Sequence, residues 1–231
     1  MDINYFKAAL SHHSKGNWNK AQEIYQHLLK EDPNNYAVLQ NYGPLLAQLR
    51  EYKLAKVVFQ KCLKLKPKDS LMLYNYGKFF HDQKIYEKAI EYYNKSFEIN
   101  PKNAMSQYNI GNIYFAQKKF KNAIEKFKKT TEINPSHFLA YNNIGLAFKK
   151  LAKRIDGVDL SGEMLKLARK RRIYKYLTQS DIITHLNRVN RKYDLVTGAD
   201  VFVYFGALNA LFAGVERVLK PGGFLVFSVE T

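Results

Sequence analysis

The sequence is short of cysteine, of long apolar runs and of acidic residues, and each shortage limits what the protein can be. Cys62 is the single cysteine, so an internal disulfide is excluded and a reducing, cytoplasmic location is favoured. No run of apolar residues is long enough to span a membrane, and the N-terminus lacks the apolar segment of a signal peptide. None of the six histidines has a Cys, Asp or Glu at metal-ligand spacing, so we expect no metal site and no membrane partner.

The shortage of acidic residues leaves the chain strongly basic. Its 37 Lys and Arg against 20 Asp and Glu give a net charge of +17. Residues 1–150 carry 24 basic and 12 acidic side chains, and residues 151–231 carry 13 and 8, so the excess is spread along the chain. An anionic partner such as RNA is one interpretation. The other is a lysine-rich composition on solvated faces, and it is favoured because no aromatic-plus-basic nucleic-acid motif is present.

What the sequence does have is a period of 34 residues. The period is marked by proline at Pro33, Pro67, Pro101 and Pro135. It defines units 2–35, 36–69, 70–103 and 104–137, followed by the first helix of a fifth unit. The eighth position holds Ala9, Gly43, Gly77, Gly111 and Gly145, and the twentieth holds Ala21, Ala55, Ala89 and Ala123. The twenty-fourth holds Tyr25, Phe59, Tyr93 and Phe127. Small residues allow two helices to approach closely, and the rings fill the space between units.

This pattern resembles the tetratricopeptide repeat (TPR) family. The resemblance implies an α-solenoid whose first helices line a concave groove. In some TPR proteins an asparagine at the sixth position holds the backbone of a bound peptide, and this position holds Asn41, Asn75, Asn109 and Asn143. A carboxamide both donates and accepts hydrogen bonds, so it can pair with a peptide group. The alternative is that these side chains are solvated or contact the next helix.

Other residues fall on groove-facing positions in the same register. They are Tyr74, Tyr108, Lys78, Asn112, His81 and Phe115. Aromatic groups with a few polar neighbours suit a peptide anchor, although rings at this spacing are at least as typical of the core between units. Pro44 is a departure, because a proline within the first helix of the second unit should kink or shift that helix.

After Lys150 the pattern changes to strands alternating with helices, which predicts a parallel α/β sheet. Strands are expected in GVDL, in YLTQSDI, at the start of YDLVTGADVFVYF and in FLVFSVE, with a helix capped by Ser161 and a turn at LKPGG. We therefore expect a helical repeat domain over residues 1–150 and an α/β domain over residues 151–231.

The order of these segments resembles the class I methyltransferases that use S-adenosylmethionine (SAM), and above all bacterial proteins in which such a domain follows TPR units. The resemblance implies that Asp159 bonds the ribose and that Asp181 contacts the adenine amino group. It places Ser161, Gly162 and Met164 on the adenine side, and Gly198, Ala199 and Asp200 beside cofactor and substrate. Asp181 and Asp200 suit caps or turns equally well. No convincing general base is present, and the catalytic residues are unknown; Asp200 and Tyr204 are only guesses.

The family's first strand and its glycine-rich loop have no counterpart before Gly157. That loop brings bare backbone to the methionine part of SAM. The expected fold is therefore an α-solenoid of four repeats and a fifth first helix, followed by a truncated Rossmann-like parallel sheet. Its second and fourth strands must pair directly or leave a gap. Two main hypotheses follow: a TPR scaffold with an impaired SAM-dependent methyltransferase-type domain, or a non-catalytic TPR adaptor for extended peptides. A third, weaker hypothesis is an RNA-binding scaffold driven by charge.

Overall fold

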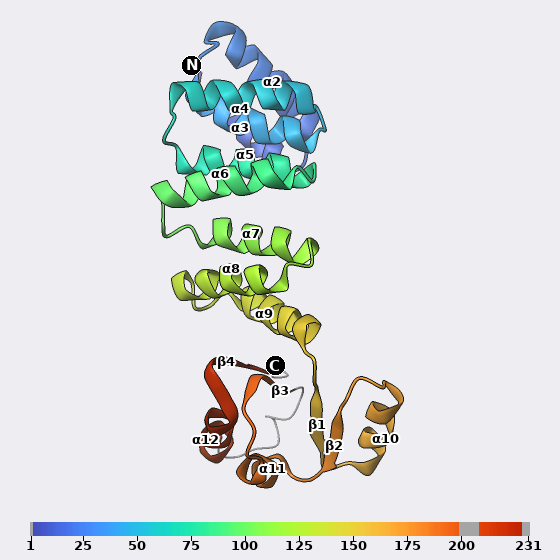
Figure 1. Ribbon diagram of the computed structural model, residues 1–231. Coiled ribbons are helices and arrows are strands. Elements are labelled where there is room, and N and C mark those ends of the chain that lie inside the picture. Colours follow the sequence, from blue (N-terminus) through green and yellow to red (C-terminus); the bar gives the residue numbers. More distant parts are fainter. Residues whose placement is uncertain (1, 199–207, 228–231) are drawn as a thin grey trace. The chain divides into compact units, whose positions relative to one another are not determined.

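The computed structural model describes residues 2–198 and 208–227 (Figure 1). The chain forms two compact units, Met1–Ile113 and Tyr114–Thr231, and each is described by itself. Helices give way to strands between Leu151, where the ninth helix ends, and Asp156, where the first strand begins. This change from helices to strands lies near residue 150, where the sequence predicts a domain boundary. The two compact units instead divide between Ile113 and Tyr114, so the boundary stays a prediction.

The first unit is built from helix pairs. Its first helices are α1 (Ile3–Ser14), α3 (Tyr36–Gln48) and α5 (Ser70–Asp82), and its second helices are α2 (Trp18–Glu31), α4 (Tyr52–Leu65) and α6 (Tyr86–Ile99). Helix α7 (Ala104–Ala116) opens the fourth repeat and crosses the limit between the units. Asp69 caps α5 by accepting a hydrogen bond from the backbone N–H of Met72 at 2.9 Å. The repeat therefore confirms the predicted helix–turn–helix period.

The core of this unit is formed by the small and large residues that the repeat pattern pairs. The rings of Phe59 and Tyr93 are buried, with 1% and 0% of their surface exposed. A Cβ atom added at Gly43 would lie 3.4 Å from the Phe59 ring, and one at Gly77 would lie 2.8 Å from the Tyr93 ring. The eighth position is small because the ring of the following helix occupies the space of a side chain.

The turn inside each repeat has one residue in the left-handed region, namely Gly16, Arg50, Lys84 and Lys118. In the third repeat the turn closes when the N–H of Ile85 donates to the carbonyl of Phe80 at 2.9 Å. Helix α3 is continuous through Pro44. Because proline has no N–H, the carbonyl of Gln40 receives no hydrogen bond from the residue one turn later.

The second unit contains two repeat helices and a strand region. The helices are α8 (Phe120–Ile133) and α9 (Phe138–Leu151). The strand region consists of β1 (Asp156–Asp159), α10 (Gly162–Lys170), β2 (Tyr176–Gln179), α11 (Ile182–Arg188), β3 (Tyr193–Gly198), α12 (Asn209–Val218) and β4 (Leu219–Phe227). Strand β1 pairs in parallel with β2, and β3 with β4. Over the described residues the strands form two two-stranded sheets, so the second and fourth strands of the expected sheet leave a gap.

The LKPGG segment corrects one expectation, because it lies inside β4 and is not a separate turn. The pairing with β3 passes from Tyr193 opposite Leu219 to Leu195 opposite Phe224, which leaves the intervening residues of β4 as an irregularity. Gly222 has φ +71 there, a conformation that glycine adopts without strain. The strand thus begins before the proline and resumes after the glycines.

Strand β4 packs on α9 at the position where earlier repeats receive the ring of a second helix. A Cβ atom at Gly145 would lie 3.6 Å from Val226. The rings of Phe148 and Phe224 lie 5.8 Å apart. Lys128 of α8 lies 4.8 Å from the centroid of the Phe224 ring and donates to the carbonyl of Gly222 at 3.2 Å. The strand region therefore covers the last repeat helix.

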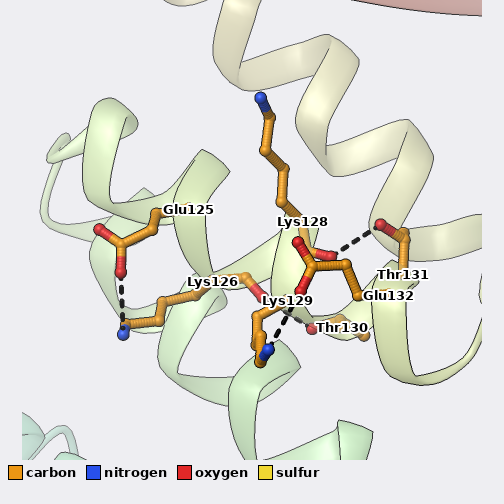
Figure 2. A network of polar contacts seen from close by, with 7 residues as sticks. All are labelled: Glu125, Lys126, Lys128, Lys129, Thr130, Thr131 and Glu132. Atoms are coloured by element: carbon orange, nitrogen blue, oxygen red, sulfur yellow. Dashed lines mark hydrogen bonds and ion pairs between the residues drawn. The ribbon is translucent and has the colours of Figure 1, made fainter. Parts of the chain in front are cut away.

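Helix α8 shows how some of the basic excess is balanced locally. Lys126 pairs with Glu125 at 3.2 Å and Lys129 with Glu132 at 3.1 Å. Figure 2 shows Lys128 extending away from these ion pairs. The Thr131 hydroxyl donates to the carbonyl of Lys128 at 2.9 Å, so this buried threonine has a hydrogen-bond partner within its own helix.

A cluster around Asp156 joins β1 to β3 across the gap. The carboxylate of Asp156 accepts from Arg154 Nε at 2.8 Å, from Arg191 at 3.4 Å and from the Tyr193 hydroxyl at 3.0 Å. Burial alone would raise the pKa of the Asp156 carboxyl, but these hydrogen bonds and the two guanidinium charges hold it below its ordinary value. We call Arg154, Asp156, Arg191 and Tyr193 the Asp156 clasp.

Candidate functional site

A pocket of about 230 Å³ opens between three consecutive first helices of the first unit. It is lined by His13 of α1, by Gln40, Asn41 and Pro44 of α3, and by Asp69, Leu71, Met72 and Asn75 at the start of α5. Leu71, which is 60% exposed, and Met72, which is 1% exposed, supply apolar surface to this lining. Its volume is below the roughly 300–1,000 Å³ of small-molecule sites and suits a single side chain.

The polar groups around this pocket are only partly used. Asn41 donates through Nδ2 to the carbonyl of Ala37 at 2.8 Å, which leaves its Oδ1 as an acceptor. Within the described residues the side chains of Gln40 and Asn75 have no hydrogen-bond partner. Asp69 is already engaged, because its carboxylate accepts from Met72 N–H at 2.9 Å and from the Tyr36 hydroxyl at 2.6 Å.

Of the four predicted asparagines, Asn41 and Asn75 are brought together at this pocket. Asn109 donates to the Tyr74 hydroxyl at 3.0 Å, so these two predicted residues contact each other across consecutive first helices. Asn143 lies in the second unit, where it has interactions of its own. The ladder of asparagines as a peptide clamp is neither confirmed nor contradicted by these contacts.

The predicted groove aromatics also contact core rings. Tyr74 lies 5.5 Å from Tyr93, and His81 lies 6.2 Å from the same ring. Burial lowers the pKa of the His81 imidazole below its ordinary value, so this side chain is neutral near pH 7. Tyr108 is half-buried and has interactions of its own. Both ring contacts lie within the third repeat, residues 70–103, so a core between repeats at these positions stays a prediction.

The second candidate site lies at the end of β1, where Asp159 is followed by the N-terminus of α10. The Asp159 carboxylate accepts from the Ser161 N–H at 2.7 Å, and the Ser161 hydroxyl accepts from the Met164 N–H at 3.3 Å. The predicted cap at Ser161 is confirmed. Gln179 of β2 donates to the carbonyl of Leu160 at 3.0 Å, which holds this turn against the neighbouring strand. Met164 is 54% exposed.

Asp181 follows β2 and caps α11, where its carboxylate accepts from the Thr184 N–H at 3.0 Å. Hydrogen bonds from Thr184 lower the pKa of this carboxyl, which is therefore ionised at neutral pH. The cap that the sequence offered as an alternative is present, and the adenine contact stays a prediction. Ala199, Asp200 and Tyr204 lie outside the described residues.

The described residues fit only one end of SAM. Asp159 could serve the ribose, but the methionine end needs bare glycine backbone between α9 and β1. Gly145 is the glycine nearest before Gly157 in the sequence, and it packs against Val226. The linker itself, residues 152–155, contains no glycine. Within the described residues the cradle for the amino-acid part of the cofactor is therefore not formed.

Other reactive groups give no site. Burial raises the pKa of the Cys62 thiol to about 12, so it stays protonated and inert. No group of three His, Cys, Asp or Glu side chains within residues 2–198 and 208–227 could hold a metal ion. None of the described helices combines the length and the apolar character that crossing a membrane requires.

Sequence models of the tetratricopeptide repeat match residues 4–35 and 36–69, and a TPR repeat model matches residues 77–118 and 111–151. These matches together span more than half of the chain. The chain belongs to the tetratricopeptide repeat family. A methyltransferase domain model also matches residues 142–227. The two kinds of match overlap in α9, which contacts β3 and β4. This TPR protein therefore carries a methyltransferase-like domain that shares a helix with its last repeat.

Solved structures similar to this TPR protein support the repeat fold. A crystal structure of MamA has 26% identity and a TM-score of 0.57, covering 64% of this chain and 80% of that one. PilF of Pseudomonas aeruginosa has 22% identity and a TM-score of 0.58, covering 72% and 71%. A tetratricopeptide repeat protein from Parabacteroides merdae has 22% identity and a TM-score of 0.57, covering 64% and 59%. No curated protein matches.

Sequence reasoning missed several residues of the pocket, although a signal for three of them was present. Gln40, Pro44 and His13 occupy the register positions of Tyr74, Lys78 and His81, which were assigned to the groove. Extending the register to the first two repeats would have found them. Asp69, Leu71 and Met72 had no such signal, because their place depends on how α5 lies against α3.

Proposed function

We propose that this protein is a scaffold that binds extended protein segments on the first helices of its repeats. The supporting observation is the pocket between α1, α3 and α5, which Asn41 and Asn75 help to line. A peptide backbone offers alternating donors and acceptors, which carboxamides can match without reading a side chain. TPR proteins in general bind protein partners, which agrees with this assignment.

The test is a pulldown with immobilised wild-type protein and with the variants Asn75→Ala and Asn109→Ala. Asn94→Ala is the matched control, because Asn94 lies exposed on the second helix α6. We expect partners retained by wild type and by Asn94→Ala to be lost from the two groove variants. An unchanged set of partners in all four samples would contradict the hypothesis that the asparagines hold a bound peptide.

We further propose that the methyltransferase-type domain of this chain does not turn over, since the residues described supply a ribose-side carboxylate without a glycine loop. In this proposal Asp159, Ser161, Met164, Asp181, Ala199 and Asp200 mark the SAM site that the family implies. The protein then acts as an adaptor. A reducing cytoplasm suits its single, buried Cys62.

Isothermal titration of the full chain with SAM separates adaptor from enzyme. We expect no heat of binding at micromolar to millimolar SAM, with Asp159→Ala as a matched sample. Micromolar affinity for SAM that is lost in Asp159→Ala would establish a working cofactor site and contradict the proposal that this domain is impaired.

A further inference from the structure

Two residues that line the pocket between α1, α3 and α5 are one helical turn apart in α3, namely Gln40 and Pro44. Pro44 lies in the middle of α3 and lines the pocket together with Gln40. Since Pro44 has no N–H, the Gln40 carbonyl lacks the donor that an ordinary residue would supply from the next turn. Gln40 is partly buried, and a carbonyl without that donor gains from a partner that brings an N–H.

The rest of the pocket fits the chemistry of one residue of an extended peptide. Leu71, Met72 and Pro44 offer an apolar surface for its side chain, within about 230 Å³. The Oδ1 atom of Asn41 is a second acceptor for an N–H, and the amide of Asn75 is a donor for a carbonyl. The same lining would be poorly matched to a phosphate, because it holds the Asp69 carboxylate and no lysine or arginine.

The negative charge of Asp69 further limits which side chains can enter the pocket. Asp69 lines the pocket with a carboxylate whose oxygens already accept from Met72 N–H and the Tyr36 hydroxyl. An acidic side chain entering the pocket would meet this carboxylate and be repelled. A neutral apolar side chain meets Leu71 and Met72 without that cost.

We infer that Pro44 is a specificity-determining residue, which frees the Gln40 carbonyl to receive a backbone N–H of an extended peptide that places one apolar side chain in this pocket. This inference rests on the proposed function of the groove. It also gives Pro44 a role, because the acceptor that Pro44 releases in its own helix is the group that binds the partner. Replacing it should strengthen the helix and weaken the binding.

The experiment selects ligands for the full chain from a random dodecapeptide library displayed on phage. The most enriched sequence is then made as a capped peptide and titrated by fluorescence polarisation. We expect enriched peptides to share an apolar residue and to lack Asp and Glu beside it. Pro44→Ala should bind that peptide about three- to tenfold more weakly, as expected for one lost hydrogen bond. It should also melt several degrees higher, because the helix regains a bond.

Two further variants separate the possible failures. Pro67→Ala makes the same change in an exposed turn after α4 and should leave the affinity unchanged. If Asn75→Ala binds the peptide more weakly while Pro44→Ala binds it as wild type does, the proposed groove function is supported and the role of Pro44 is overturned. If no peptide is enriched, or if Asn75→Ala binds it unchanged, the proposed groove function itself is overturned. A variant that melts higher and binds more weakly supports the inference.

Discussion

The repeat helices of residues 2–113 and the strand region of residues 156–227 differ in how completely they bury their side chains. In the repeats, rings such as Phe59, Tyr76 and Tyr93 are almost fully buried. In the strand region, no described residue of β1, β2, β3 or β4 is fully buried. Its core is a small cluster of Leu186, Leu211, Val215 and Val218 between α11 and α12.

The difference follows from where each region finds its packing partners. Gly43 and Gly77 each pack against a ring sixteen residues later, so these contacts are local and recur with the period. Parallel strands need partners from distant parts of the chain, and among residues 2–198 and 208–227 no strand joins the two pairs. Part of the missing packing is replaced by the hydrogen bonds of the Asp156 clasp and by the contacts of β4 with α9.

The largest expected difference between the two regions is the cost of deleting a packed side chain. Phe59→Ala should lower the free energy of unfolding by about 3–5 kcal/mol, because it leaves a cavity among buried rings. Val226→Ala in β4 should cost about 1 kcal/mol, because Val226 is only partly buried. Urea unfolding followed by circular dichroism measures both. Equal losses would show that the strand region is as well packed as the repeats.

The same substitution at two equivalent repeat positions sharpens the comparison. Gly77→Ala should destabilise the protein by about 1–3 kcal/mol, since its Cβ would lie 2.8 Å from the Tyr93 ring. Gly145→Ala meets Val226 at 3.6 Å and should stabilise α9 by up to about 1 kcal/mol through helix propensity. Thermal melts of the two variants should shift in opposite directions. A shift in the same direction would contradict the looser packing of β4.

The Asp156 clasp predicts a pH dependence in the strand region. The folded pKa of Asp156 is below its unfolded value of about 3.8, so its contribution is complete above that pH and is lost as the pH falls through the folded pKa. Asp156→Asn should cost about 1 kcal/mol at pH 7, because its partners are partly exposed. Asp194→Asn is the control, since its pair with Lys220 is exposed. Urea midpoints of wild type and Asp156→Asn should converge below pH 3.8; a constant difference would refute the clasp.

The smallest effect is expected at the turns inside the repeats. Lys84 has φ 60, which costs an ordinary residue about 1–2 kcal/mol, whereas glycine adopts it freely but loses more entropy on folding. Lys84→Gly should therefore stabilise the first unit by about 0.5–1 kcal/mol. Lys88→Gly, inside helix α6, is the control and should destabilise. A melting point that falls for both would show that the turn residue is not strained.

Much of the repeat region could be read from the sequence because its evidence is local. The helix starts follow the 34-residue period, Gly43 allows α3 and α4 to approach closely, and the Phe59 ring reaches Tyr76 of the next repeat, as the pattern predicts. The asparagine positions were found in the same way, and two of them reach the pocket. The pocket itself was not predicted, because its shape depends on the angle at which α5 meets α3 and on the helix running through Pro44.

For the strand region the sequence determined the kinds of element and the caps at Ser161 and Asp181, since these depend on neighbours within three residues. Only the tertiary structure decided that the strands divide into two pairs, that Asp156 bridges them, and that β4 rather than a second helix covers Gly145. Propensity and spacing fix local hydrogen bonds, but which distant surfaces meet is decided by the burial available to the whole chain.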